Sequence, residues 1–344
     1  MVQYKPFAER TSDTQYRELL RRTIETGVQS FTQMDEDAIR LVGPQLHFDL
    51  TNGFPLITER DLLAPSPTGG PSQFEMGIAE LCAFLNGART LEEMRRFGCG
   101  WWAPWVTEEK CRKRGLEPGD LGPGSYGPAF RAFPTADPDI IAEIKATTEY
   151  GSARPADAVA SFAKIKGLVE QIKPFDQITH LVEQIRELPH LRTHIVTPFI
   201  PQYLGRGKGK QQKVVVVPCH GQLHVFTDYP ARGEMTIHHM QRSADVPVGL
   251  VFNLTQYAAL LMMLAQVTGY VARLLVFTIS DAHIYVGAND QRSVVEELLT
   301  TKPERLPTVK LDPDVTDIFT FRPHHFRVTD YHPQLERRRI KTPV

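Results

Sequence analysis

A cysteine directly after a run of valines is the strongest candidate for a reactive side chain. Cys219 follows the valines at 214–217 and Pro218, and His220 comes next. The valines predict a buried strand, which the proline ends. A thiol at the mouth of such a strand, beside a potential proton carrier, is the arrangement expected of a nucleophile. The alternative is a small apolar core residue, which is the commoner setting for a free cysteine.

Polar motifs downstream favour the nucleophile. Residues 241–245 read Gln-Arg-Ser-Ala-Asp, Phe252 and Asn253 open a long apolar stretch, and residues 281–285 read Asp-Ala-His-Ile-Tyr. In this order the motifs resemble the thymidylate synthase family. Further stretches resemble the same family at 54–58, 80–87, 119–123, 126–127 and 176–178. The resemblance runs from about Thr51 to the C-terminus. It implies an α+β fold with a large mixed β-sheet, packed with helices around a long apolar central helix.

The reaction that this resemblance implies is one-carbon transfer to carbon 5 of a pyrimidine nucleoside 5'-monophosphate. The donor is 5,10-methylenetetrahydrofolate, and no metal is implied. Attack of a thiolate on carbon 6 makes the ring enolate-like, so that carbon 5 can attack the one-carbon electrophile. The nucleophile has to be soft, ionisable near neutrality and easily expelled, and cysteine meets all three demands. Cys219 is therefore expected to be the nucleophile.

The resemblance also assigns roles to other residues. Glu80 lies within an apolar stretch, and a buried carboxyl group with a raised pKa suits proton transfer; the alternative is an exposed position on a helix. Arg242 is expected to lie near the thiol and to hold the phosphate, because its planar fork grips phosphate oxygens in pairs. The remaining catalytic candidates are Tyr126 and His220. The nucleotide-binding candidates are Arg242, Ser243, Gln241, Asn253, His283, Tyr285 and, from the partner chain of a homodimer, Arg192.

Two candidates are expected at the folate, and one residue bears on the base. Trp102 matches an aromatic residue that lies against the folate, although a core tryptophan is the alternative, and Asp245 matches a position that supports the pterin ring. Asn253 matches the residue that reads the pyrimidine edge. An amide offers a donor and an acceptor and so pairs with the N3–H and O4 of uracil. In the phage deoxycytidylate hydroxymethylases of this family the position is aspartate. Asparagine favours uracil here without settling the base.

Several stretches depart from the family pattern. The phosphate loop of the family is replaced by Gln-Met-Asp-Glu-Asp-Ala at 33–38, where acidic residues would repel a phosphate. The loop at 122–126 has gained a residue, Thr193 replaces the second arginine of the partner motif, and the tail at 341–344 is two residues short. A looser lid would admit water. These changes favour a divergent 5-hydroxymethylase acting on a cytidylate or uridylate. The alternatives are an orthodox thymidylate synthase, which methylates dUMP, and a catalytically idle relative that binds nucleotide or RNA.

Composition narrows the class of protein further. The 344 residues are 42% hydrophobic and 23% charged, with a net charge of -1, so no global field would attract nucleic acid or a membrane surface. The cysteines, of which Cys82 is expected in the core, have no spacing typical of a metal site. We find no signal peptide and no apolar run of about 18 residues. The sequence therefore predicts a reduced, cytoplasmic protein.

The elements that must position these residues form one predicted catalytic domain spanning 1–344. Hydrophobic periodicity predicts helices and strands, and Gly, Pro and Ser mark loops. A family-specific insertion is expected at 136–173. The predicted helices are 13–28, 73–86, about 158–172, 176–188 and 255–268, the second and the last ended by Gly87 and Gly269. The predicted strands are 45–50, 214–217, 221–227, 235–239 and 274–279, with another beginning at 195–197. The predicted loops are 65–71, 106–120 and 205–213, of which the last is basic and flexible and is more typical of a solvated turn than of a phosphate contact.

Overall fold

The computed structural model describes residues 2–67, 69–135, 138–149, 155–207, 209, 211–228, 230–231 and 233–343. Most of the predicted strands are present, with ends within a few residues of those expected. The strands are β1 (Val28–Phe31), β2 (Asp37–Val42), β3 (Gln45–Asp49), β4 (Ile195–Val196), β5 (Gln222–Thr227), β6 (Glu234–Gln241), β7 (Ala244–Asp245), β8 (Val271–Ile279), β9 (Asp281–Tyr285), β10 (Thr308–Leu311) and β11 (Phe326–Thr329).

The strands form two mixed sheets and a ribbon. The larger sheet has the order β3-β8-β6-β5-β4, with β6 and β8 parallel and the other neighbours antiparallel. The smaller sheet has the order β1-β2-β9-β7, in which only β7 and β9 are parallel. β10 and β11 pair antiparallel by themselves. Since β8 leads directly into β9, the chain passes from one sheet to the other next to the 281–285 motif.

Helices cover the sheets, and the longest one forms the centre of the core. The α-helices are α1 (Gln15–Thr26), α2 (Gln73–Leu85), α3 (Leu91–Arg96), α4 (Glu108–Arg112), α5 (Tyr126–Arg131), α6 (Pro138–Glu149), α7 (Pro155–Gln171), α8 (Gln177–Glu187), α9 (Pro201–Leu204), α10 (Gly249–Thr268) and α11 (Arg292–Thr300). Short 3₁₀ turns are η1 (Phe7–Glu9), η2 (Leu50–Asn52), η3 (Ala103–Trp105), η4 (Ile318–Thr320) and η5 (Pro323–His325).

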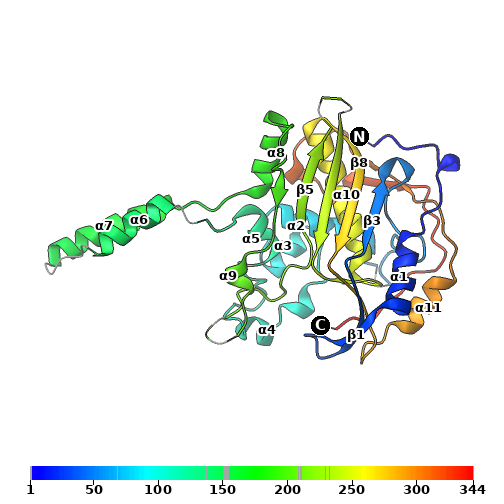
Figure 1. Ribbon diagram of the computed structural model, residues 1–344, viewed down its shortest axis with the longest axis horizontal. Helices are drawn as coiled ribbons and strands as arrows, with labels where there is room; N and C mark the ends of the chain where they lie inside the picture. The colour runs from blue at the N-terminus through cyan, green and yellow to red at the C-terminus, as the bar shows by residue number, and fades with distance from the viewer. Residues whose placement is uncertain are drawn as a thin grey trace.

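α10 is the central helix that the sequence predicted, although it begins earlier than expected, at Gly249. It packs against α2, β6 and β8, and Figure 1 shows the large sheet in front with these two helices behind it. By length and composition it could cross a membrane, but 89% of its apolar window is buried inside the protein, as in a core helix. Gly269 ends it in the left-handed region, with φ 82°, where glycine has no steric penalty.

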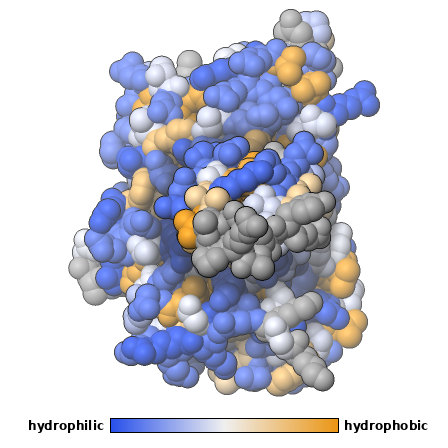
Figure 2. Space-filling view, turned by 90° about the vertical axis from the view of Figure 1, so that its left-hand side faces the viewer, coloured by the Kyte–Doolittle hydropathy of each residue, from blue (hydrophilic) through white to orange (hydrophobic). Residues whose placement is uncertain are grey.

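The stretch 136–173, which was expected to be an insertion, contains two helices rather than the one that was predicted. α7 matches the expected helix, whereas α6 was not predicted. The two pack against each other and extend away from the sheets as an arm on the left of Figure 1. Figure 2 looks onto this side of the molecule, whose surface is mainly hydrophilic with separate hydrophobic patches. Val159 and Phe162 on α7 are 70% and 71% exposed.

Two predictions from the sequence are wrong, namely the strand at 214–217 and the exposed loop at 106–120. Val214–Val217 is not a strand, because its backbone is used by other partners: Val215 N–H bonds to Leu121 O at 3.0 Å, and Val217 O accepts from the Arg242 side chain at 3.3 Å. The stretch 106–120 is not only an exposed loop, because it contains α4, whose Cys111 is fully buried.

Candidate active site

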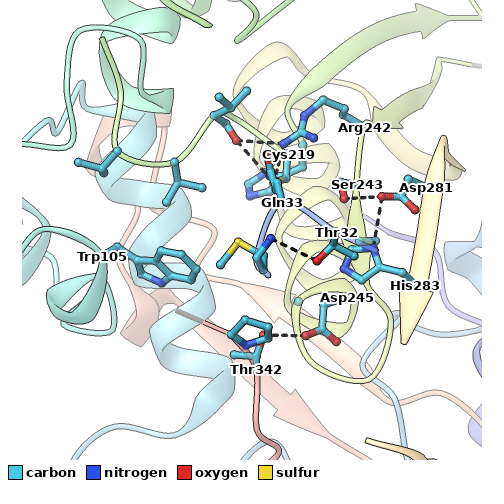
Figure 3. Close-up of a pocket in the computed structure, with 18 of the residues that line it drawn as sticks. Thr32, Gln33, Trp105, Cys219, Arg242, Ser243, Asp245, Asp281, His283 and Thr342 are labelled. Carbon is cyan, nitrogen blue, oxygen red and sulfur yellow. Dashed lines mark hydrogen bonds and ion pairs between the residues drawn. The ribbon is translucent and has the colours of Figure 1, made fainter. Parts of the chain in front are cut away.

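A cavity of about 1360 Å³ opens between the central helix, the small sheet and the loops that precede Cys219. It is large enough for two organic ligands side by side, since sites for one drug-sized ligand are about 300–1,000 Å³. Figure 3 shows part of its lining. Most of the candidates from the sequence lie on its walls, namely Glu80, Trp102, Cys219, His220, Gln241, Arg242, Ser243, Asp245, Asn253, His283 and Tyr285. Tyr126 and Arg192 are not part of the lining.

Cys219 and Arg242 are in direct contact on the wall of this cavity. The Arg242 Nη2 lies 3.1 Å from the Cys219 Sγ, and the same guanidinium donates from Nε to Pro218 O at 3.1 Å. Because the main chain holds Arg242 as well, its charge is fixed beside the sulfur. Burial raises the pKa of the Cys219 thiol, and the positive charge of Arg242 opposes that effect. The site therefore holds a thiol together with the cation that stabilises its ionised form.

Tyr126 holds the backbone of Cys219 from outside the cavity lining. Its Oη accepts a hydrogen bond from the backbone N–H of Cys219 at 2.7 Å, and its ring stacks on His220 at 4.4 Å between centroids. The helix that carries it can approach because of Gly127, where a Cβ would lie only 2.2 Å from Ala88 O. The Nδ1 of His220 lies 2.6 Å from the Tyr257 hydroxyl, and burial lowers the pKa of His220 to about 3. His220 is therefore a neutral imidazole at physiological pH.

Glu80 lies on α2 with its carboxylate inside the cavity wall, so it is not at the exposed helix position that was the alternative. Both indoles of the Trp101–Trp102 pair donate to Oε1, at 2.6 and 2.5 Å, and Gln256 Nε2 donates to Oε2 at 2.6 Å. Burial raises the pKa of Glu80, and these three hydrogen bonds oppose the shift. A carboxyl group whose pKa is raised above its ordinary value is suited to proton transfer.

Trp102 itself is 8% exposed and packs against Phe84 and Tyr126. Trp102 therefore belongs to the core, as in the alternative expected from the sequence, and also lines the cavity. Trp101, which was not singled out from the sequence, lies against Phe252 with ring centroids 5.0 Å apart. Both indoles contribute aromatic surface to the cavity wall.

Three side-chain amides form a buried chain next to Glu80. Asn253 Nδ2 donates to Gln256 Oε1, and Asn253 Oδ1 accepts from Gln241 Nε2, both at 2.9 Å. Gln241 Oε1 is buried without a hydrogen-bond partner among the described residues, so it is an acceptor available to a ligand. Gln256 was not identified from the sequence. The indication was there, because it lies three residues after Asn253 and so on the same face of a helix.

The 281–285 motif contributes a polar cluster to the cavity wall. Ser243 Oγ donates to Asp281 Oδ2 at 2.9 Å, and His283 Nδ1 lies 3.4 Å from the same oxygen. Burial favours the neutral form of Asp281, but His283, Ser243 and the charge of Arg40 outweigh it, so the pKa of Asp281 is below its ordinary value. The carboxylate is therefore ionised and orients the hydroxyl and the imidazole.

Asp245 connects the site to the C-terminal tail. Its Oδ2 accepts from Thr342 Oγ1 at 2.8 Å and from Gln291 Nε2 at 3.1 Å, and Pro343 lines the cavity. Burial raises the pKa of Asp245, while the charge of His283 and these hydrogen bonds oppose it. The tail thus lies across the part of the site that the sequence assigned to the folate.

The segment that was expected to replace a phosphate loop, 33–38, forms the turn between β1 and β2 and the start of β2. Thr32 and Gln33 face the cavity, whereas the Glu36 carboxylate turns away and accepts from Asn289 N–H at 3.0 Å. Glu36 is therefore not placed to repel a phosphate bound in the cavity, as had been expected from the sequence. Arg40 on β2 lines the cavity and makes no ion pair with the described residues. Arg40 was not predicted from the sequence because it lies two residues beyond the 33–38 segment. Residues two apart on a strand share a face, so Arg40 lies on the same face of β2 as the buried Ala38.

A basic rim surrounds another part of the opening. It comes from α4, from the two residues that follow α4 and from the 205–213 loop, all within stretches that were expected to be loops. The loop closes as a turn through Lys213 N–H to Tyr203 O at 2.9 Å and borders the cavity. Burial lowers the pKa of Arg114, and the positive charge of Arg206 lowers it further. The rim residues are Lys110, Lys113, Arg114 and Arg206.

No group of three or more His, Cys, Asp or Glu side chains suited to a metal is found in the residues the structure describes. Arg192 is exposed and lies outside the cavity of its own chain, so its expected role at the partner's phosphate stays a prediction. A family model of thymidylate synthase matches residues 14–344, which covers both sheets and every candidate named above. The chain therefore belongs to the thymidylate synthase family, whose members carry out folate-dependent one-carbon transfer to carbon 5 of a pyrimidine nucleotide.

Proposed function

We propose that this protein uses 5,10-methylenetetrahydrofolate to place a hydroxymethyl group on carbon 5 of a pyrimidine nucleoside 5'-monophosphate. The observation that carries the proposal is the contact of 3.1 Å between Cys219 Sγ and Arg242 Nη2 inside a cavity that also holds Glu80 and Asn253. A positively charged neighbour stabilises the thiolate that must attack the ring. The protein is proposed to act as a cytoplasmic homodimer, with residues 1–344 as one catalytic domain.

Cys219 makes and breaks the covalent bond to the nucleotide. Its thiolate adds to carbon 6, which moves an electron pair to carbon 5. Carbon 5 forms a bond to the one-carbon unit and then loses its proton, and the thiolate leaves at the end as carbon 6 regains its double bond. The folate supplies the one-carbon unit and, in a reductive methylation, also a hydride. Trp101, Trp102 and Asp245 are the residues proposed to hold it.

Glu80 is the group proposed to handle the proton of a water molecule. Hydroxymethylation adds the oxygen of water to the exocyclic methylene of the nucleotide, and that water has to give up a proton. The Glu80 carboxylate lies on the cavity wall with a raised pKa and is held by two indoles and an amide, so it can accept a proton and return it. The altered segment at 33–38, whose Gln33 and Met34 line the cavity, supports a changed substrate environment.

Phosphate binding is proposed for Arg242, Ser243 and Arg40. Arg242 is half-buried beside the nucleophile. Arg40 reaches the same cavity from β2 and forms no ion pair within 4.0 Å among the described residues, although its charge contributes to lowering the pKa of Asp281. Two guanidinium groups and a hydroxyl suit a dianionic phosphate. Arg192 of the partner subunit is proposed to complete this group.

The second candidate is reductive methylation, as in an orthodox thymidylate synthase. It is favoured by the tail, because the bond of 2.8 Å from Thr342 Oγ1 to Asp245 Oδ2 holds the chain across the site. A closed site excludes water and so favours hydride transfer over hydration.

Covalent trapping and product analysis test these proposals in sequence. The protein is first incubated with methylenetetrahydrofolate and a 5-fluoro pyrimidine nucleotide. A covalent ternary adduct is expected, and its absence would overturn one-carbon transfer by this site. UMP, dUMP, CMP and dCMP are then offered as substrates. A mass gain of CH₂O with release of tetrahydrofolate is expected, whereas a methyl gain with dihydrofolate would show the second candidate to be correct.

Two cysteine variants make the test specific. Cys219→Ala should abolish both the adduct and the turnover. Cys111→Ala is the matched control, because the Cys111 side chain is buried outside the cavity and its thiol donates to Asp120 O. It should retain both activities. Full turnover by Cys219→Ala would contradict the assignment of the nucleophile.

A further inference from the structure

We infer that Gln256 is a positioning residue that fixes the amide orientation of Asn253 and thereby restricts the substrate to uracil nucleotides. This inference rests on the proposed function, because it places a pyrimidine ring against Asn253. It concerns a different property, however, which is the choice between uracil and cytosine.

One end of the amide chain is fixed by a backbone carbonyl. Gln256 Nε2 donates to Gly77 O at 3.1 Å and to the Glu80 carboxylate at 2.6 Å. A backbone carbonyl can only accept, so the NH₂ of Gln256 has to face α2, whatever the protonation state of Glu80. Its Oε1 is then left as the acceptor for Asn253 Nδ2 at 2.9 Å. Gln256 is 1% exposed, so water does not offer an alternative partner.

The other end of the chain is fixed independently in the same way. Gln241 Nε2 donates to Ser243 O at 2.9 Å, which again requires an NH₂ group at that point. The same nitrogen donates to Asn253 Oδ1 at 2.9 Å. The carbonyls of Gly77 and Ser243 therefore demand the same orientation of Asn253 from opposite sides.

Reversing the Asn253 amide alone would create two mismatches. Its NH₂ would face the NH₂ of Gln241, and its oxygen would face the Oε1 of Gln256. Both contacts are buried, where an unmatched polar group is costly. Amide orientation is assigned from hydrogen bonds, and here both ends of the network agree on a single assignment.

The fixed orientation selects the base. Glu80 lies on the Gln256 side of Asn253, and in the proposed reaction Glu80 serves the carbon 5 edge of the ring. The substituent on carbon 4 is next to carbon 5, so it meets the Nδ2–H of Asn253, and ring position 3 meets Oδ1. Uracil matches this arrangement, because O4 accepts and N3–H donates.

Cytosine fails at both points. Its amino group would face the Asn253 NH₂, and its unprotonated N3 would face an oxygen. A site built to hydrogen-bond one polar pattern rejects the opposite pattern strongly. We expect the wild-type protein to prefer uridylates over cytidylates by at least about 100-fold in kcat/KM.

Substitutions of Gln256 test the mechanism of this preference. Gln256→Leu removes the acceptor of Asn253 Nδ2, which frees Asn253 at one end, and the uridylate-to-cytidylate ratio should fall about tenfold, the value of roughly one hydrogen bond. Gln256→Glu keeps an acceptor toward Asn253, so the ratio should stay near wild type while turnover falls, because a second carboxyl group then faces Glu80. A role in folding alone would not separate these two variants by base preference.

Gln266 provides the matched control on the same helix. Its Nε2 donates to the backbone carbonyls of Asp312 and Val315, both at 2.8 Å, away from the cavity. Gln266→Leu should lower thermal stability but leave the base ratio unchanged.

The outcomes separate the inference from the proposed function. Failure of 5-fluoro nucleotide trapping would defeat the proposed function. Successful trapping with a wild-type preference for cytidylates, or an unchanged ratio in a folded Gln256→Leu variant, would overturn the inference alone. A fall of about tenfold in the uridylate-to-cytidylate ratio of Gln256→Leu, with an unchanged ratio in Gln256→Glu and Gln266→Leu, would support it.

Discussion

Removing the charge of Arg242 should make Cys219 a less reactive nucleophile. The guanidinium Nη2 lies 3.1 Å from the sulfur, and no other cation is in hydrogen-bond contact with the Sγ in the described structure. Burial already raises the pKa of this thiol, and Arg242 is the first influence that opposes the shift. Arg242→Met should therefore move the thiol pKa upward, so that less thiolate is present at any pH below it.

The Coulomb energy sets the size of the effect. Two unit charges about 4 Å apart attract by about 1 kcal/mol in water and by about 4 kcal/mol at an effective dielectric constant near 20. The lower value alone corresponds to about a fivefold loss of thiolate. The half-buried position of the pair places the real effect at or above this value.

Alkylation by iodoacetamide measures the thiolate directly. The three other cysteines are buried, and burial raises the pKa of Cys82 to about 12, so Cys219 should dominate the reaction. We expect Arg242→Met to react at least about fivefold more slowly at pH 7.5, with its rate profile displaced to higher pH. Cys219→Ala gives the background rate.

Two variants decide whether charge is the cause. Arg242→Lys retains the positive charge and should recover part of the rate. Arg206→Met removes a different cation of the same cavity, one that bonds to Gln212, and should leave the profile unchanged. A wild-type rate profile for Arg242→Met would refute the role given to this contact.

Two further predictions concern the phosphate and the pH dependence of stability. Arg40→Met should raise the Kd of a nucleoside monophosphate at least about tenfold, because charged hydrogen bonds contribute about 1.5–3 kcal/mol, and should leave the Kd of the corresponding nucleoside unchanged; calorimetry with both ligands would exclude a phosphate contact if they weakened equally. Burial raises the pKa of Glu59 from 4.5 to about 7, so its contribution to stability is fully present below about pH 4.5 and is lost as pH rises to about 7. Glu59→Gln should abolish this part of the pH dependence in denaturant unfolding, and an unchanged difference between pH 5 and pH 8 would contradict the assignment.

Most of the fold could be predicted from periodicity. α2, α8 and α10 were expected because their apolar residues follow the helical repeat, and β5, β6 and β8 because theirs alternate or form short runs. The failures have local causes. The valines at 214–217 have the composition of a strand, but their backbone partners are Leu121 and the side chain of Arg242, neither of which a local pattern reveals.

The candidate site could be predicted as a set of residues but not as a set of contacts. Most of the candidates found with the motifs around Cys219, Arg242 and Asn253 do line the cavity. Arg40 and Gln256 were not predicted because neither belongs to a motif. Each is brought to the site by contacts between elements that are far apart in the sequence. The register of β2 with β9 aligns Arg40 with His283, and the packing of α2 on α10 brings Gln256 to Glu80.

The hydrogen bonds joining Glu80, Gln256 and Asn253 connect proton transfer to base recognition. Gln256 reaches Glu80 at 2.6 Å and Asn253 at 2.9 Å, so a change at one end alters the partner of the other. Aspartate at 253 alone would set a carboxylate oxygen against Gln256 Oε1. The Gln256 amide cannot turn over to offer its NH₂ instead, because that NH₂ donates to Gly77 O. On this inference, a protein of this architecture acquires a preference for cytosine only when positions 253 and 256 change together, because the same amide that orients the base-reading group also holds the catalytic carboxyl group.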